Sequence, residues 1–146
     1  MTTSASHVGT LPRIALVTGA NKDIGLAIAA GLLRESFTVY LGARDAERSA
    51  AAITRGDERA WVGQPDMAYS SSKTALNAVT VHFARELAGT PIKVNGAAPG
   101  HVATDFNQFR GERTPEQGAA VAIWLATLPA DGPTGAVFQD RGQLAW

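Results

Sequence analysis

The sequence predicts an α/β fold in which a parallel sheet of about four strands is flanked by helices. The expected strands are short apolar runs at residues 14–17, 37–41, 91–97 and 135–138. The expected helices have apolar residues at helical spacing and span residues 24–34, 67–87 and 116–128. This alternation of strands and helices is typical of βαβ units, whose parallel strands are joined by right-handed crossovers.

The first βαβ unit is expected to follow a short tail. Residues 1–12 are small and polar without periodicity, so a single domain is predicted for residues 13–146. Residues 14–17 are continuously apolar, which predicts a strand that is buried on both faces. Residues 45–55 are rich in Ala and Arg and compatible with a helix, and the Gly, Pro and charges of residues 56–66 indicate a connecting loop.

The long helix at residues 67–87 carries an apolar stripe formed by Leu76, Val79, Phe83 and Leu87. Tyr69 and Lys73 fall within this stripe at 100° per residue, so they are expected to point toward the sheet or a cleft. The third helix has an N-cap signal in Thr114 followed by Pro115. The last strand is followed by a polar tail that ends at Trp146.

Composition limits the classes of partner. Lys plus Arg and Asp plus Glu number 13 each, so the net charge is zero and no basic excess indicates nucleic acid or a membrane surface. The chain has no Cys, which excludes disulfides and thiolate chemistry. It also has no apolar run near the roughly 18 residues of a membrane span and no signal-peptide pattern at its start. A small molecule or another protein is the expected partner, and a cytoplasmic location is the default.

Tyr69 and Lys73 stand four residues apart, a spacing that brings two side chains together on one helical face. An ordinary Tyr has a pKa near ~10, but a neighbouring ammonium stabilises the phenolate and lowers that pKa. The pair therefore predicts a general acid or base.

Three motifs occur in a fixed order along the chain. Residues 18–25 read T-G-x-x-x-x-x-G, residues 69–73 read Y-x-x-x-K, and residues 95–104 read N-x-x-x-P-G-x-x-x-T. In this order they resemble the short-chain dehydrogenase/reductase family, and NADPH-dependent carbonyl reductases above all. The resemblance covers residues 13–55 and 66–146, and it implies a Rossmann-like fold and an NADP cofactor.

The resemblance assigns roles to single residues. It implies that Tyr69 donates a proton to a substrate carbonyl and that Lys73 lowers the pKa of Tyr69 and holds the nicotinamide ribose. Arg44 ends the second strand about 20 residues after the glycine turn, where an Arg suits a 2′-phosphate and hence NADP, with Lys22 assisting. The cofactor-binding residues expected in total are Gly19, Asn21, Lys22, Ile24, Gly25, Arg44, Pro99, Gly100, Val102 and Thr104.

The chain departs from the family pattern in its middle and in its glycine turn. Only the 24 residues 45–68 separate Arg44 from Tyr69, where the family places three strands, their helices and a catalytic Ser. No Ser of this chain matches that family position. Asp23 stands where the family has its middle glycine, so a carboxylate is expected to oppose a bound phosphate.

The missing block predicts a truncated Rossmann-like sheet and an uncovered helix. The simplest closed sheet pairs residues 13–18 directly with residues 91–97, which gives a four-stranded parallel sheet of order 2-1-3-4. The helix at 67–87 loses its usual neighbour, which leaves Ala75, Ala78 and Val79 uncovered. Such an apolar surface favours a homodimer.

Three functions are compatible with these features. The first is an NADPH-dependent reductase of a small carbonyl compound that uses Tyr69 and Lys73. The second is a non-catalytic relative that dimerises or pairs with a full-length homologue. The third is a cofactor-independent proton-transfer enzyme, such as an isomerase, dehydratase or cyclase, that uses the same Tyr and Lys.

Overall fold

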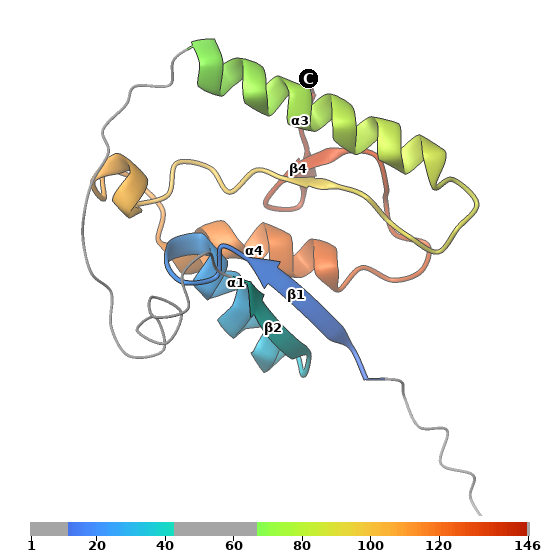
Figure 1. The fold of residues 1–146 in the computed structure, drawn as a ribbon, viewed down its shortest axis with the longest axis horizontal. Coiled ribbons are helices and arrows are strands. Elements are labelled where there is room, and N and C mark those ends of the chain that lie inside the picture. Colours follow the sequence, from blue (N-terminus) through green and yellow to red (C-terminus); the bar gives the residue numbers. More distant parts are fainter. Residues whose placement is uncertain (1–11, 43–66, 146) are drawn as a thin grey trace, which may run out of the picture.

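A computed structural model describes residues 12–42 and 67–145, with side chains from residue 71 onward in the second range (Figure 1). It confirms the α/β class. The elements, in chain order, are β1 (Ile14–Thr18), α1 (Asp23–Arg34), β2 (Thr38–Gly42), α3 (Met67–Glu86), β3 (Gly96–Ala97), the 3₁₀ turn η1 (Asp105–Asn107), α4 (Pro115–Ala126), β4 (Val137–Gln139) and β5 (Gly142–Gln143). The helix expected within residues 45–55 lies outside the described residues.

The described strands form two separate sheets. β1 pairs in parallel with β2, in a register that runs from Ile14 opposite Thr38 to Thr18 opposite Gly42. β3 pairs in parallel with β4, and β4 pairs antiparallel with β5, which forms within the expected polar tail. The predicted pairing of residues 13–18 with 91–97 is wrong, because β1 and β3 belong to different sheets and the single order 2-1-3-4 is not formed.

The third predicted strand is much shorter than expected. Residues 91–97 contribute only Gly96–Ala97 to a strand. Upstream of it, the Val94 N–H donates to the Thr134 hydroxyl at 3.0 Å, and the Lys93 ammonium donates to the carbonyls of Ala130 and Gly132 at 2.7 and 2.9 Å. Upstream of Gly96, this segment is therefore joined to the loop before β4 by side-chain hydrogen bonds together with a backbone bond from the Gly135 N–H to the Val94 carbonyl at 2.8 Å, and not by a regular ladder.

β1 and β2 are covered on one face only. Ala15, Val17 and Val39 are half-buried on the side of α1, whereas Ile14 and Leu16 point to the other side and are 61% and 70% exposed. The prediction that residues 14–17 are buried on both faces is therefore wrong. Within the described ranges no element is packed on the outer face of this two-stranded sheet.

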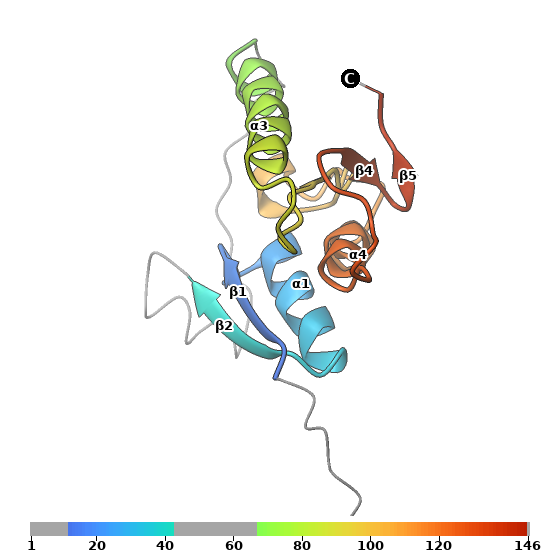
Figure 2. The same ribbon diagram turned by 90° about the vertical axis from the view of Figure 1, so that its right-hand side faces the viewer.

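The core lies around α4, which links the two sheets. α1 packs along α4 through small buried residues, and α4 also contacts β3 (Figure 2). Val121 packs with Ala136 and Phe138 in the centre of this layer. The ring of Trp124 lies edge-on to that of Phe138 with centroids 5.3 Å apart, a favourable aromatic geometry.

α3 lies nearer to the β3-β4-β5 sheet, and only a narrow strip of its surface is buried. Thr80 and Ala84 are buried, and Ala84 lies beside Gly135 before β4. The expected inward stripe is wrong, because Leu76, Val79 and Phe83 are about half exposed. Ala75, Ala78 and Val79, which were also expected to lie uncovered, are exposed as that second prediction required. None of the helices in the described part of the chain has the length and apolar character needed to span a membrane.

Candidate functional site

The glycine turn after β1 is fixed to the end of β2. The N–H groups of Gly19 and Ala20 donate to the carbonyl of Gly42 at 2.7 and 3.3 Å. Gly25 lies against Gly19, because a Cβ added at Gly25 would be 2.3 Å from the Gly19 carbonyl oxygen. The absence of a side chain at Gly25 thus lets α1 begin directly against the turn, and Gly19 adopts a left-handed φ of +67° in open space.

Asp23, the first residue of α1, has a left-handed backbone conformation that favours glycine. Its φ is +50°, in the left-handed region that costs about 1 kcal/mol or more for a residue with a side chain. Burial raises the pKa of its carboxyl above the ordinary value of 3.8, and the nearby Asp105 charge adds to this increase. The Lys22 ammonium, 3.9 Å from the Asp23 carboxylate, and a hydrogen bond from the Asp105 N–H oppose it.

Lys22 joins the glycine turn to the segment that follows Thr104. Its ammonium donates a hydrogen bond to the Asp105 carboxylate and forms an ion pair with it. Asp105 is the first residue of η1, so the turn after β1 and the loop after β3 meet at this point. In Figure 1 both turns lie on the side of the molecule where α3 begins.

The loop from Pro99 to Thr104 follows β3 and packs against α4. The Ala98 N–H donates to the Phe138 carbonyl at 2.8 Å, which anchors the start of the loop to β4. Val102 is buried where α4 carries Gly118, since a Cβ added at Gly118 would be 2.5 Å from the Val102 Cγ2 atom. Thr104 is also buried, and its N–H donates to the Asn107 side chain at 3.1 Å.

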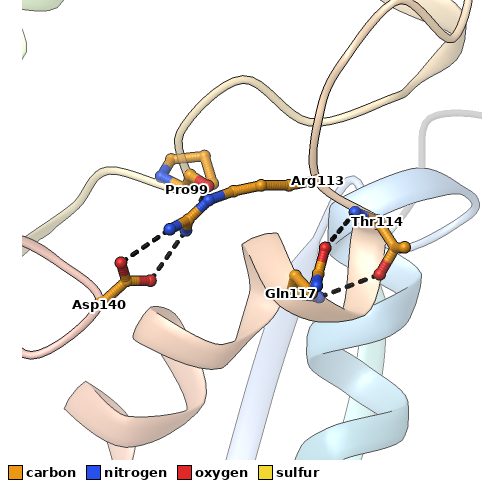
Figure 3. A network of polar contacts seen from close by, with 5 residues as sticks. All are labelled: Pro99, Arg113, Thr114, Gln117 and Asp140. Atoms are coloured by element: carbon orange, nitrogen blue, oxygen red, sulfur yellow. Dashed lines mark hydrogen bonds and ion pairs between the residues drawn. The ribbon is translucent and has the colours of Figure 1, made fainter.

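Arg113 holds the beginning of this loop (Figure 3). Its guanidinium donates two hydrogen bonds to the Asp140 carboxylate, at 2.8 and 2.7 Å, and a third to the Pro99 carbonyl at 3.3 Å. Such a bidentate pair fixes both distance and direction. A Cβ added at Gly100 would be only 3.0 Å from the Arg113 side chain, and Gly100 has a left-handed φ of +77°. This position of the loop therefore requires glycine.

The start of α4 next to Arg113 is capped as predicted. The Thr114 hydroxyl accepts a hydrogen bond from the Gln117 N–H at 3.3 Å, and the Gln117 side chain accepts one from the Thr114 N–H at 2.8 Å (Figure 3). Pro115 occupies the first helical position. This capping box satisfies groups that would otherwise lack partners at the helix end.

Tyr69 and Lys73 both belong to α3, one turn apart. Lys73 is exposed and precedes Thr80 by seven residues, so it shares the helical face on which Thr80 and Ala84 are buried. Arg44 lies outside the described residues. Among the described residues, no group of three or more His, Cys, Asp or Glu is placed to hold a metal ion.

The structure adds three polar residues to those expected from the sequence. Asp105, Arg113 and Asp140 hold the two loops through contacts that join residues 83 and 27 positions apart. Of these three residues, only Asp105 lay beside a sequence motif, because it follows Thr104. Which residues contact one another is decided by the tertiary fold.

The backbone at the glycine turn fits a dinucleotide cofactor, and the charges there fit it in part. Gly19 leaves open space, Gly25 allows the close approach of α1, and the first N–H groups of α1 favour an anion. Lys22 supplies a cation for a phosphate. Asp23 and Asp105 supply two carboxylates at the same place, so the ammonium of Lys22 is shared with acidic groups of the chain itself.

Sequence comparison finds relatives for part of the chain. A family model described as short chain dehydrogenase matches residues 63–115. Carbonyl reductase (NADPH) 3 of Rattus norvegicus is 37% identical over 90 residues, which cover 58% of this chain and 32% of that protein. Carbonyl reductase (NADPH) 1 of Bos taurus is 33% identical over a match of the same extent. The chain thus spans about a third of the length of these curated relatives.

Structural comparison supports the same fold. Salutaridine reductase from Papaver somniferum superimposes with a TM-score of 0.70 at 17% identity, covering 88% of this chain and 99% of that chain. Acetoin dehydrogenase from Enterobacter cloacae gives a TM-score of 0.64 at 16% identity, covering 88% and 94%. At such identities the likeness concerns the fold alone.

Proposed function

We propose that the chain, which is similar to short chain dehydrogenases over residues 63–115, belongs to the short-chain dehydrogenase/reductase family and is an oxidoreductase that uses NADPH to reduce a small carbonyl compound. The observation that carries the proposal is the meeting of the glycine turn with the loop after β3 through Lys22 and Asp105. The similarity to two carbonyl reductases named for NADPH supports NADPH as the cofactor. The proposal takes residues 13–146 as one domain in a cytoplasmic protein.

The residues proposed to hold the cofactor lie at the ends of β1 and β3. The turn from Gly19 to Gly25 and the first N–H groups of α1 would receive the pyrophosphate. Lys22, with Arg44, would hold the 2′-phosphate. The loop from Pro99 to Thr104, which Arg113 fixes, would meet the nicotinamide. Bound NADPH supplies a hydride for the carbonyl carbon.

Tyr69 is proposed to supply the proton for the carbonyl oxygen. Reduction leaves negative charge on that oxygen, so a phenol within hydrogen-bond reach lowers the barrier by donating its proton. Lys73, one turn away in α3, would stabilise the resulting phenolate and lower the pKa of Tyr69. General acid catalysis of this kind contributes roughly 10²- to 10⁴-fold to a rate.

The two tyrosines of the chain allow a matched test. NADPH consumption would be followed at 340 nm with a panel of small aldehydes and ketones, and NADPH binding would be measured separately. Tyr69→Phe should lower kcat by about 100-fold or more while NADPH still binds. Tyr40→Phe, an exposed position in β2, should leave kcat unchanged. Equal activity of the parent and Tyr69→Phe would contradict the role of Tyr69, and a parent that binds no NADPH would contradict the proposal.

A second candidate function is that of a dimerising relative without catalysis, and the exposed stripe of α3 favours it. Leu76, Val79 and Phe83 follow one another at helical spacing and are about half exposed. Burying ~600 Å² of apolar surface per partner is worth roughly 15 kcal/mol before association costs, which can reach a similar size. We therefore propose a homodimer through α3, in a catalytic or a non-catalytic protein.

Sedimentation equilibrium at micromolar concentration tests the homodimer. Val79→Asp should shift the protein toward monomer, because it places a charge within the stripe. Arg85→Asp, an exposed change on the opposite side of α3, is the control and should leave the dimer intact. A compact monomer formed by the parent protein would refute this assembly.

A further inference from the structure

Asp105 has a charge for which the proposed reduction gives no role. Its carboxylate is bound by the Lys22 ammonium, and the Asp105 side chain is only 12% exposed, whereas that of Lys22 is 48% exposed. A carboxylate with so little contact with water depends on a cation or on hydrogen-bond donors to offset its lost hydration. The Lys22 ammonium is the cation that meets it in the described part of the chain.

The backbone of Asp105 strengthens the same connection. The backbone N–H of Asp105 faces the Asp23 carboxylate and acts to lower its pKa, and this carboxylate lies 3.9 Å from the Lys22 ammonium. Two adjacent residues of the glycine turn are thus bound to one residue of the loop after β3. Two carboxylates share one ammonium at the place where the proposed cofactor would bring a phosphate.

We propose that Asp105 determines the selectivity between NADPH and NADH by competing with the 2′-phosphate for Lys22. The inference rests on the proposed function, because it requires that a nicotinamide dinucleotide binds at the glycine turn. The two cofactors differ only in the 2′-phosphate. A group that occupies the Lys22 ammonium therefore weakens NADPH binding and leaves NADH binding nearly unchanged.

The competition follows from charge and burial. A single ammonium satisfies one closely bound anion, and a 2′-phosphate that takes Lys22 leaves the Asp105 carboxylate without its cation and with little access to water. The phosphate also approaches two negative side chains. The parent chain should thus show only a small preference for NADPH, although Lys22 stands in the turn to provide one.

Asp105→Asn removes the charge while retaining a side chain of nearly the same shape and the backbone N–H that binds Asp23. Lys22 is then available to the 2′-phosphate. The ratio of the NADH dissociation constant to the NADPH dissociation constant should rise by at least tenfold. Asp131→Asn makes the same change of net charge in the exposed turn before β4 and should leave the ratio as it is in the parent.

A second variant separates the competition from a general change of charge. Lys22→Met removes the group for which the two anions compete, so adding Asp105→Asn to it should no longer change the ratio. Far-UV circular dichroism of each variant would verify that it is folded. The dissociation constants would be measured by titration of the full chain with each nucleotide at one fixed ionic strength, since salt screens these interactions.

The outcomes distinguish the inference from the function on which it depends. A tenfold or larger rise with Asp105→Asn, absent when Lys22 is Met, supports the inference. The inference is overturned, and the function is left standing, if both nucleotides bind but Asp105→Asn leaves the ratio of the two dissociation constants unchanged. The same conclusion follows if Asp105→Asn changes that ratio equally with Lys22 present or replaced by Met. Failure of both nucleotides to bind the parent and Asp105→Asn overturns both.

Discussion

Two strands of similar apolar character, β1 and β4, differ completely in burial. Phe138 of β4 is 4% exposed, whereas Leu16 of β1 is 70% exposed. β4 has α4 against it, and Gly135 just before β4 lies beside Ala84 of α3, while the described elements cover β1 and β2 from the side of α1 only (Figure 2). An apolar run thus predicts a strand, but the elements placed on each of its faces decide how far it is buried.

The same contrast separates the two halves of the candidate site. The loop after β3 is fixed by the buried side chain of Val102, by the Arg113–Asp140 pair and by the capped start of α4. The glycine turn after β1 depends on hydrogen bonds to Gly42 and on ionic contacts of two exposed or half-buried side chains. We expect the first half to be rigid and the second to respond more strongly to substitution of charges.

The largest expected effect compares the two strands directly. Phe138→Ala removes a buried ring that contacts Trp124 and should lower the free energy of unfolding by about 3–5 kcal/mol. Leu16→Ala should change it by less than about 1 kcal/mol, because most of that side chain already meets water. Urea denaturation of both variants measures the difference. An equally large loss for Leu16→Ala would mean that the outer face of β1 is covered in solution.

The next effect concerns the glycine turn. Gly25→Ala places a Cβ 2.3 Å from the Gly19 carbonyl oxygen, so α1 must move away from the turn. The strain should cost about 1–3 kcal/mol of stability and weaken NADPH binding. Gly142→Ala, whose added Cβ would be no closer than 3.7 Å to its nearest neighbour, is the control and should be nearly neutral in urea denaturation. Unchanged stability of Gly25→Ala would show that the turn and α1 are not in close contact.

A smaller effect on stability is expected at the start of α4, the helix that contacts both α1 and β3. Thr114→Ala removes the hydroxyl that accepts the Gln117 N–H and should cost about 1 kcal/mol in thermal or urea unfolding. Thr114→Ser retains the hydroxyl and should restore most of that stability. If Ser and Ala gave the same loss, the capping hydrogen bond would not be the cause.

The smallest expected effects are pH-dependent changes in stability, and they have opposite signs for Asp140 in the loop half of the candidate site and Asp23 in the glycine-turn half. Hydrogen bonds from Arg113 lower the pKa of Asp140, so its stabilising contribution is present above the ordinary pKa of 3.8 and is lost as the pH falls through the lower folded-state value. Burial raises the pKa of Asp23, so stability linked to Asp23 is greatest below 3.8 and falls as the pH rises through the folded-state value. At pH 7, Asp140→Asn should therefore destabilise the protein and Asp23→Asn should stabilise it. Urea denaturation between pH 3 and pH 7 gives both signs, and two shifts of the same sign would contradict the account.

The sequence predicts the helices and the glycine turn well because their signals are local. Helical spacing of apolar residues predicted α1, α3 and α4, and Thr114 with Pro115 predicted the start of α4. The three motifs predicted the similarity to short chain dehydrogenases that the sequence comparison also finds. The two glycines of the turn, Gly19 and Gly25, have the geometry that their spacing indicated.

The sheet order and the polar contacts of the site could not be predicted in the same way. The pairing of β1 with β3 was expected only because it gives the simplest single sheet. No local pattern specifies which strand edges meet. Lys22 and Asp105 are 83 residues apart, so their contact depends on the complete fold. The burial of Thr80 and Ala84 in place of Val79 and Phe83 likewise reflects which face of α3 meets the loop before β4.

Amide hydrogen exchange with and without saturating NADPH tests the central claim most directly, since it reports cofactor binding and its location in one measurement. The account predicts slower exchange of residues 19–26 and 98–107, with little change in β4, whose amides are already protected by the core. Unchanged exchange in both segments, or protection confined to other parts of the chain, would contradict the claim that the glycine turn and the loop after β3 form a dinucleotide site.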